Sequence, residues 1–241
     1  KFYWGNWNQN YLSRIWNLPK RVYYFENRSC VLRKIHKQQE PVSVTAFKRT
    51  KPHARYQNLS EVERRDIRLT CTAEQFYLCA YCCQSISGTN EDTMNEHVEA
   101  QKLAPNRTLD FNNIVASCRT SKQCDAAHDS QVLPLTPLMD ECETELKFKI
   151  SGRVEGLTQR AIDTIQVLNL GDNEQNNKAL IEKRKYLSES LLWSNGIDPN
   201  EGLEDDELLQ SIINDLLTPQ NGKLESFAPV VANILKNWIA V

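Results

Sequence analysis

The chain of 241 residues lacks an apolar run of about 18 residues, the length at which a helix can span a membrane. It also lacks internal repeats, a glycine-rich phosphate-binding loop and the nucleophile elbow of serine hydrolases. No basic segment followed by an apolar stretch and a cleavage site opens the chain. These absences favour a protein with no membrane partner and exclude several common enzyme classes.

Histidine is scarce, with four residues, whereas cysteine is plentiful, with eight. Four of these cysteines have the spacing of metal ligands, which fits a reducing compartment better than a disulfide scaffold. We therefore expect a cytoplasmic location. The apolar fraction of 40% is enough for a hydrophobic core in one domain or two small ones.

Two cysteine pairs form the most specific pattern in the chain. Cys79 and Cys82 are separated by two residues, a spacing that lets two thiolates reach one tetrahedral ion. Cys118 and Cys124 would complete the site, although five residues lie between them. We expect these four cysteines to bind a structural Zn²⁺; the alternative is that they are small buried hydrophobic residues. Cys30, Cys71 and Cys142 have no partner at ligand spacing and are predicted to be core thiols. Cys83 is adjacent to Cys82 and could replace it as a ligand.

An acid and a histidine, Glu96 and His97, lie between the two cysteine pairs. A neutral imidazole can take a proton from water near pH 7, and a neighbouring divalent ion would complete a site for phosphodiester hydrolysis. Glu96 can supply one oxygen ligand to that ion. The second ligand is expected on a helix after Cys124, where Asp125 and His128 share a face; we prefer His128 and keep Asp125 as the alternative.

Asn113 comes just before the next predicted strand and can hold the base, or its loop, by hydrogen bonds. The other two histidines, His36 and His53, lack acidic neighbours at ligand spacing, so we expect neither to be catalytic.

Together these residues resemble an HNH endonuclease of the zinc-stapled kind. The segment from Asn113 to Cys118 keeps the family's Asn-to-Cys offset, with Ile114 in place of leucine. The resemblance implies an α+β fold with a ββα-metal core, a general base at His97, a Mg²⁺ or Mn²⁺ ligand at Glu96 and an orienting asparagine at Asn113. Asp125 holds the place of the family's usual helix ligand, and His128 lies one turn later, so the third site residue stays open.

A narrower resemblance rests on four segments that match the PtuB-like HNH proteins of Septu-type and retron-linked antiphage systems. They are Leu32-Arg33-Lys34-Ile35, Glu40-Pro41, Thr45-Ala46-Phe47-Lys48 and Glu74-Gln75. The resemblance covers about residues 31–195. It implies an antiviral effector nuclease that works with a PtuA-like ATPase of the ABC/SMC type. In retron-linked systems it also implies a reverse transcriptase and its nucleic acid as partners.

Charge is distributed unevenly along the chain. Residues 1–70 hold 15 Lys+Arg against 5 Asp+Glu, while residues 71–241 hold 14 against 26. The basic part suggests where phosphates approach, and the acidic part suits a protein partner or is a solvated helical surface. A basic stretch at residues 34–55 can contact phosphate or can be an ordinary soluble surface.

We divide the chain into an aromatic-rich extension at 1–30, a nuclease module at 31–140 and a mainly helical region at 141–241. Helices are predicted near 59–78, 158–170, 174–193, 203–217 and 226–240, with a helix start at 123–130. Strands are predicted at 94–98 and 114–116, and a small hairpin within 146–154.

Two other functions compete with a metal-dependent nuclease acting on DNA or RNA. One is a non-catalytic zinc knuckle that binds nucleic acid or protein. The other is a scaffold subunit whose nuclease site has decayed.

Overall fold

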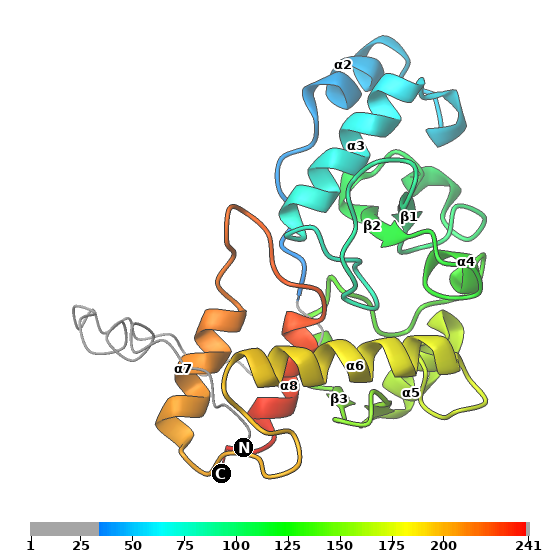
Figure 1. Cartoon of the computed structure of the whole chain (residues 1–241). Coiled ribbons are helices and arrows are strands. Elements are labelled where there is room, and N and C mark those ends of the chain that lie inside the picture. Colours follow the sequence, from blue (N-terminus) through cyan, green and yellow to red (C-terminus); the bar gives the residue numbers. More distant parts are fainter. Residues whose placement is uncertain (1–33, 240–241) are drawn as a thin grey trace.

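The computed structural model describes residues 34–239 of the chain. The predicted extension at residues 1–30 and Cys30 lie outside the described residues. Within the described part the fold is α+β, with two small antiparallel sheets among helices α2 to α8 (Figure 1). No helix in residues 34–239 is long and apolar enough to cross a membrane.

Helix α3 (Glu61–Glu74) begins where its sequence predicts, because Ser60 and Glu63 form a reciprocal capping box. It ends at Glu74, earlier than predicted, and the backbone then turns through left-handed conformations at Phe76 and Tyr77. Helix α2 (Val42–Thr50) lies within the basic stretch and was not predicted; it packs on α3 through Val44 and Phe47.

Strands β1 (Thr93–His97) and β2 (Ile114–Cys118) pair antiparallel, with Glu96 opposite Val115 and His97 opposite Ile114. Helix α4 (Asp125–His128) follows β2 and is a single turn, shorter than predicted. Within residues 34–239, four short 3-10 helices connect the elements: Tyr56–Asn58, Pro105–Arg107, Phe111–Asn113 and Asp140–Glu143.

The side chain of Gln75 joins the end of α3 to the middle of β2. Its amide accepts from the backbone N–H of Ala116 at 2.7 Å and donates to the carbonyl of the same residue at 2.8 Å. Both backbone groups of Ala116 are thereby satisfied on the side of β2 that has no neighbouring strand. Helix α3 is thus fixed against the small sheet that carries the site.

The region after residue 140 contains the predicted hairpin and four helices. Strands β3 (Leu146–Phe148) and β4 (Val154–Gly156) pair antiparallel, as expected. The helices lie close to their predicted ranges: α5 (Gln159–Leu168), α6 (Lys178–Ser194), α7 (Asp206–Leu216) and α8 (Ala228–Lys236). Thr158 caps α5 by accepting a hydrogen bond from the N–H of Ala161.

One hydrophobic core continues across residue 140. It joins Ile67 of α3 and Val115 of β2 to Ile165 of α5 and Val230 of α8. A second cluster holds α7 against α8 through residues such as Leu209 and Val231. Because buried residues of both regions share one core, the cysteine pairs of the first region are held partly by helices of the second.

Candidate functional site

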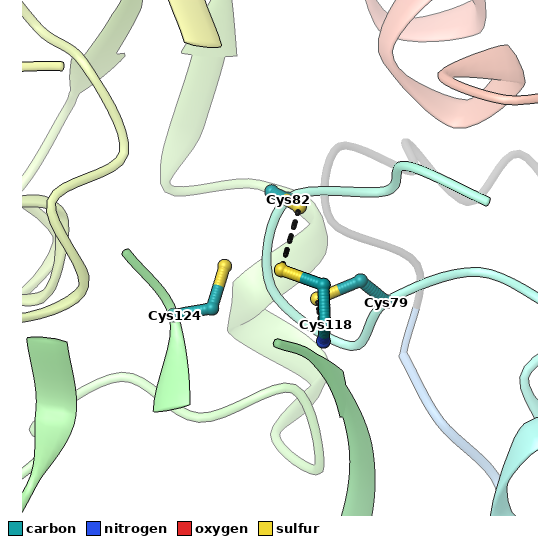
Figure 2. Close-up of side chains that lie close together, drawn as sticks. All are labelled: Cys79, Cys82, Cys118 and Cys124. Carbon is teal, nitrogen blue, oxygen red and sulfur yellow. Dashed lines mark hydrogen bonds between the residues drawn. The ribbon is translucent and has the colours of Figure 1, made fainter. Parts of the chain in front are cut away.

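The four predicted ligands Cys79, Cys82, Cys118 and Cys124 come together, and their sulfurs all lie within 4.8 Å of one another. Cys79 and Cys82 lie in the turn after α3, Cys118 ends β2 and Cys124 precedes α4 (Figure 2). All four are buried. We call them the cysteine cluster. Cys83 does not belong to it, and Cys71 and Cys142 are buried core residues, as predicted.

One sulfur–sulfur distance in the cluster matches that of a tetrahedral zinc site. Zinc–sulfur bonds of about 2.3 Å place the sulfurs of a regular tetrahedron about 3.8 Å apart. The sulfurs of Cys82 and Cys118 are 3.9 Å apart. The cluster can therefore hold a metal ion such as zinc, despite the five-residue gap before Cys124. That gap is closed by left-handed backbone at Lys122 and Cys124 and by a hydrogen bond from Cys124 N–H to the carbonyl of Leu168 at 2.9 Å.

Nearby donors stabilise negative charge on these sulfurs. The backbone N–H of Cys118 points at Cys79 Sγ at 3.3 Å, and the Gln123 amide donates to the sulfurs of Cys82 and Cys118 at 3.7 and 3.6 Å. Hydrogen bonds from Cys124, Cys79 and Cys82 lower the pKa of the Cys118 thiol well below its usual range. Burial raises the pKa values of Cys82 and Cys124. The N–H donors around the cluster thus favour the thiolate form that a metal ligand needs.

Glu96 and His97 occupy the last two positions of β1, and both line one cavity of about 630 Å³. Adjacent side chains of a regular strand point to opposite faces. Pairing continues without a bulge through His97, and both residues nevertheless line this cavity. Asp125 at the start of α4 lines this cavity too, whereas His128 does not.

The His97 ring is held from two sides. Its Nε2 lies 2.9 Å from the carbonyl of Thr108, and the Tyr56 ring meets it edge to face at 4.8 Å. Burial lowers the pKa of His97, which keeps the ring neutral at pH 7. Because a carbonyl only accepts, Nε2 carries the hydrogen of the neutral ring and Nδ1 keeps its lone pair. His97 is thus arranged to accept a proton at Nδ1.

The hydrogen bonds of Asn113 go to the loop, not to the histidine. Its side-chain oxygen accepts from Glu99 N–H at 2.8 Å, and its amide donates to the carbonyl of Glu99 at 3.0 Å. The backbone carbonyl of Asn113 also accepts from Val98 N–H at 2.9 Å. Asn113 therefore closes the base of the loop at 98–113, the second of its two predicted roles.

Glu96, Asp125 and His128 contact one another through Glu96; we call them the acid cluster. Glu96 Oε1 lies 2.5 Å from His128 Nδ1 and accepts from the Tyr81 hydroxyl at 3.2 Å. Asp125 and Glu96 line the same cavity, close enough for the Glu96 carboxyl to affect the pKa of Asp125. Burial, followed by the bond to Glu96 and its charge, raises the pKa of Asp125 to about 8. Two carboxyl groups so close together retain a proton at neutral pH unless a cation replaces it.

The fully buried His128 has a second partner, because its Nε2 lies 2.9 Å from the carbonyl of Gln131. Both ring nitrogens are therefore occupied, and the helix residue that faces the cavity is Asp125. Among residues 34–239, only the cysteine cluster brings three or more ligand atoms of His, Cys, Asp or Glu together as one convergent set. The acid cluster is instead built from contacts that each involve Glu96.

A scan of known protein-family models gives no match to this chain. A search of curated proteins likewise finds no significant relative.

Basic side chains reach the cavity from α3 and from the loop after β1, not from the predicted basic stretch. Arg64, Arg68 and Lys102 line the cavity. Within the basic stretch, three lysines are instead held in ion pairs with acids: Lys34 with Asp140, Lys37 with Glu74 and Lys48 with Glu40. These three lysines therefore form ion pairs within the protein.

Several side chains of the site were missed by sequence reasoning. Tyr81 and Gln123 adjoin cysteine ligands, so their position next to a metal motif was an available signal. Tyr56 and Arg64 lie far from the motif in sequence, and α3 brings Arg64 to the cavity. No local pattern distinguishes Arg64 from Arg65 beside it.

Proposed function

We propose that this chain is a metal-dependent nuclease of the HNH type that hydrolyses phosphodiester bonds in DNA or RNA. One observation supports this above all: Glu96, His97 and Asp125, from a strand end and a helix start, line a single cavity next to the cysteine cluster. A zinc knuckle that only binds a partner does not need an acid, a neutral histidine and a second acid to converge in this way.

His97 is the general base in this proposal. Its lone pair at Nδ1 takes a proton from the attacking water, while the carbonyl of Thr108 holds the other nitrogen. The depressed pKa of His97 keeps the ring in its basic form at neutral pH. Tyr56 restricts rotation of the ring by packing against it edge to face.

Glu96 and Asp125 are the residues that would hold Mg²⁺ or Mn²⁺, because both face the cavity and both offer the oxygen ligands that hard cations prefer. Burial and the neighbouring Glu96 raise the pKa of Asp125 to about 8. The pair therefore holds a proton at neutral pH that a divalent cation can replace. When bound, the ion would stabilise the pentacoordinate phosphate and the leaving oxygen. His128 fixes the Glu96 carboxyl from behind, and Asn113 fixes the loop.

Arg64 and Lys102 would position the substrate. The exposed Lys102 lies at the cavity, and Arg64 stacks over the Tyr56 ring at 5.4 Å with its Nε lacking a hydrogen-bond partner. Both cations can contact phosphates next to the scissile bond without contributing to sequence recognition. Arg68 is less available because it bonds the carbonyl of Gly88 and the carboxylate of Glu61.

The cysteine cluster with Zn²⁺ would fix the turns that carry the site and take no part in the reaction. The resemblance to PtuB-like proteins, together with the acidic second part of the chain, supports an antiphage effector subunit that acts with an ATPase. Co-purification with the product of a neighbouring ATPase gene tests this; a chain that runs as a lone monomer in that lysate would contradict it.

The decisive experiment compares wild type, His97→Ala and His53→Ala on a panel of DNA and RNA substrates. Each protein is assayed with Mg²⁺ or Mn²⁺, with and without the ATPase. His53 is exposed and lies outside the cavity, so its variant controls for loss of a histidine. We expect His97→Ala to lower the cleavage rate by about 10²- to 10⁴-fold, and His53→Ala to match wild type.

Equal cleavage by wild type and His97→Ala would show that the cavity is not the active site. The chain would then be a zinc knuckle that binds nucleic acid or protein. Complete absence of cleavage in wild type under all conditions, with zinc bound and the fold intact, would favour the scaffold subunit with a decayed site.

A further inference from the structure

Tyr81 lies in the turn between two members of the cysteine cluster, Cys79 and Cys82. Its side chain is among the largest fully buried ones of the described residues. A buried tyrosine needs a hydrogen-bond partner for its hydroxyl. The Tyr81 hydroxyl donates to Glu96 Oε1 at 3.2 Å. The turn that brings two sulfurs to the cysteine cluster therefore also brings a hydrogen-bond donor to the acid cluster.

Backbone hydrogen bonds attach this donor and its acceptor to the same strand. The N–H of Ala80, next to Tyr81, donates to the carbonyl of Ala116 in the middle of β2 at 3.0 Å. On the other edge of β2, strand β1 carries Glu96 opposite Val115. Tyr81 and Glu96 are thus attached to opposite edges of one short strand, which limits how far either can move relative to the other.

A second neighbour meets the same oxygen of Glu96. Nδ1 of the fully buried His128 lies 2.5 Å from Oε1, so both contacts fall on one side of the carboxyl group. Glu96 is itself buried, yet it lines the cavity. With Oε1 held in this way, Oε2 is the oxygen that can be offered to an ion in the cavity.

We propose that Tyr81 is a positioning residue for the catalytic ion, because its hydroxyl fixes the Glu96 carboxylate in the orientation that binds Mg²⁺ or Mn²⁺. This inference rests on the proposed function, in which Glu96 is a ligand of that ion. The outer partners of metal ligands orient those ligands and change metal affinity by about 10- to 100-fold. The zinc-binding turn thereby reaches the second metal site through one side chain, besides holding the fold.

A tyrosine that only fills the core is the competing explanation. Its hydroxyl would then need an acceptor for its own sake, and the effect on the acceptor would be incidental. The two explanations differ in what is lost with the hydroxyl. Removing it from a core residue changes stability and leaves the affinity for a divalent cation unchanged. Removing it from a positioning residue weakens cation binding in a protein that still folds and binds zinc.

Mn²⁺ binding to the zinc-loaded full chain, followed by electron paramagnetic resonance without nucleic acid, separates the two explanations. Wild type is compared with Tyr81→Phe, which keeps the ring and removes one buried oxygen. Tyr77→Phe is the matched control, because Tyr77 lies just before the same turn and lines a different cavity. Glu96→Gln removes the proposed ligand. We expect Tyr81→Phe to weaken Mn²⁺ binding by about 10- to 100-fold, Tyr77→Phe to match wild type and Glu96→Gln to lose the site.

The Glu96→Gln variant keeps two different failures apart. If it loses Mn²⁺ while Tyr81→Phe binds the ion as tightly as wild type, the role of Tyr81 is overturned and the proposed metal site stands. If Glu96→Gln binds Mn²⁺ like wild type, or wild type binds none, the proposed metal site fails and the role of Tyr81 fails with it. Zinc content and melting temperature are measured for every variant. Loss of zinc from Tyr81→Phe would show that the hydroxyl holds the cysteine cluster itself, which would also overturn the proposal.

Cleavage as a function of Mn²⁺ concentration gives an independent readout. A positioning role predicts that Tyr81→Phe needs more Mn²⁺ for half-maximal cleavage and regains the wild-type rate at saturation, whereas Glu96→Gln does not regain it. A Tyr81→Phe rate that stays low at saturating Mn²⁺, with unchanged Mn²⁺ affinity, would mean that the hydroxyl acts in the reaction itself. That result would overturn the positioning role.

Discussion

The cysteine cluster and the acid cluster lie close together in sequence and differ in how they are built. In the cysteine cluster, four sulfurs converge within 4.8 Å, buried on every side and surrounded by N–H donors. In the acid cluster, contacts run through Glu96 alone, and Asp125 faces an open cavity. The first arrangement can enclose a metal ion, and under the proposed function the second would leave room for a substrate beside its ion.

This difference is the one that separates structural from catalytic metal sites in general. A structural zinc site is closed by protein ligands, whereas a catalytic ion keeps positions for water and substrate. It follows that the two clusters should respond differently to mutation. Damage to the cysteine cluster should reduce stability, and damage to the acid cluster should reduce activity while stability is kept or gained.

The largest effect is expected from Cys118→Ser, which removes one of the four sulfurs of the cysteine cluster. Binding of structural zinc contributes directly to folding, so we expect a loss of about 5 kcal/mol or more in the free energy of unfolding with zinc present. Chemical denaturation measures it. Cys71→Ser is the matched control: this buried thiol contacts the carbonyl of Ile114 at 3.5 Å and lies outside the cluster. It should lose about 1–2 kcal/mol and keep its response to zinc.

A smaller loss of stability should follow when the packing of α6 is disturbed by a substitution that changes no cysteine. At Gly152, with φ +81°, an added Cβ would lie 2.1 Å from the carbonyl oxygen of Ile181 in α6. We expect Gly152→Ala to destabilise the fold by about 2–4 kcal/mol. Gly196→Ala has a similar φ of +76° but meets nothing within 4 Å, so it should lose about 1 kcal/mol from backbone strain alone. Equal losses in thermal unfolding would show that α6 is not held at this turn.

Much of the cysteine cluster could be predicted from sequence because its signals are local. The spacing of Cys79 and Cys82 and the order of the two pairs identified the ligands, and Ser60 with Glu63 located the start of α3. The five-residue gap before Cys124 looked unfavourable. It is tolerated because Cys124 adopts a left-handed backbone and bonds Leu168, a contact over a long sequence separation.

The acid cluster was harder to predict because its arrangement depends on tertiary packing. A helical face predicts that Asp125 and His128 lie together, but not which one meets the cavity. The distinction arises because His128 uses its second nitrogen on Gln131 and is buried behind Glu96. The burial of Arg184 in α6 could not be predicted for a similar reason, because this helix is rich in Lys and Glu and nothing in the sequence marks one arginine as buried.

The acid cluster predicts that stability falls as pH rises, which is the opposite of the effect of most carboxyl groups in folded proteins. The pKa of Asp125 rises from 3.8 to about 8 in the fold, so the folded state holds a proton that the unfolded state has lost. Without divalent ions, stability should therefore fall as pH rises from about 4 through about 8. We expect a loss on the order of 1–2 kcal/mol, reduced by solvent screening at this partly exposed group. Asp125→Asn should flatten the dependence, as should added Mg²⁺.

The smallest effect should come from the cavity wall, where α3 carries two adjacent arginines in different settings. Arg64 lines the cavity and lies over Tyr56, while Arg65 pairs with Asp66 at 3.3 Å and has a side chain that is 58% exposed. If nucleic acid enters this cavity, Arg64→Met should raise KM about tenfold and weaken its dependence on salt, because one phosphate contact is lost. Arg65→Met should change KM by less than about twofold, since its charge faces solvent. Steady-state cleavage at several salt concentrations measures both. If the two variants have the same KM and the same dependence on salt, the substrate does not contact this wall of the cavity. A nucleic acid that reaches the acid cluster would then have to enter from another side.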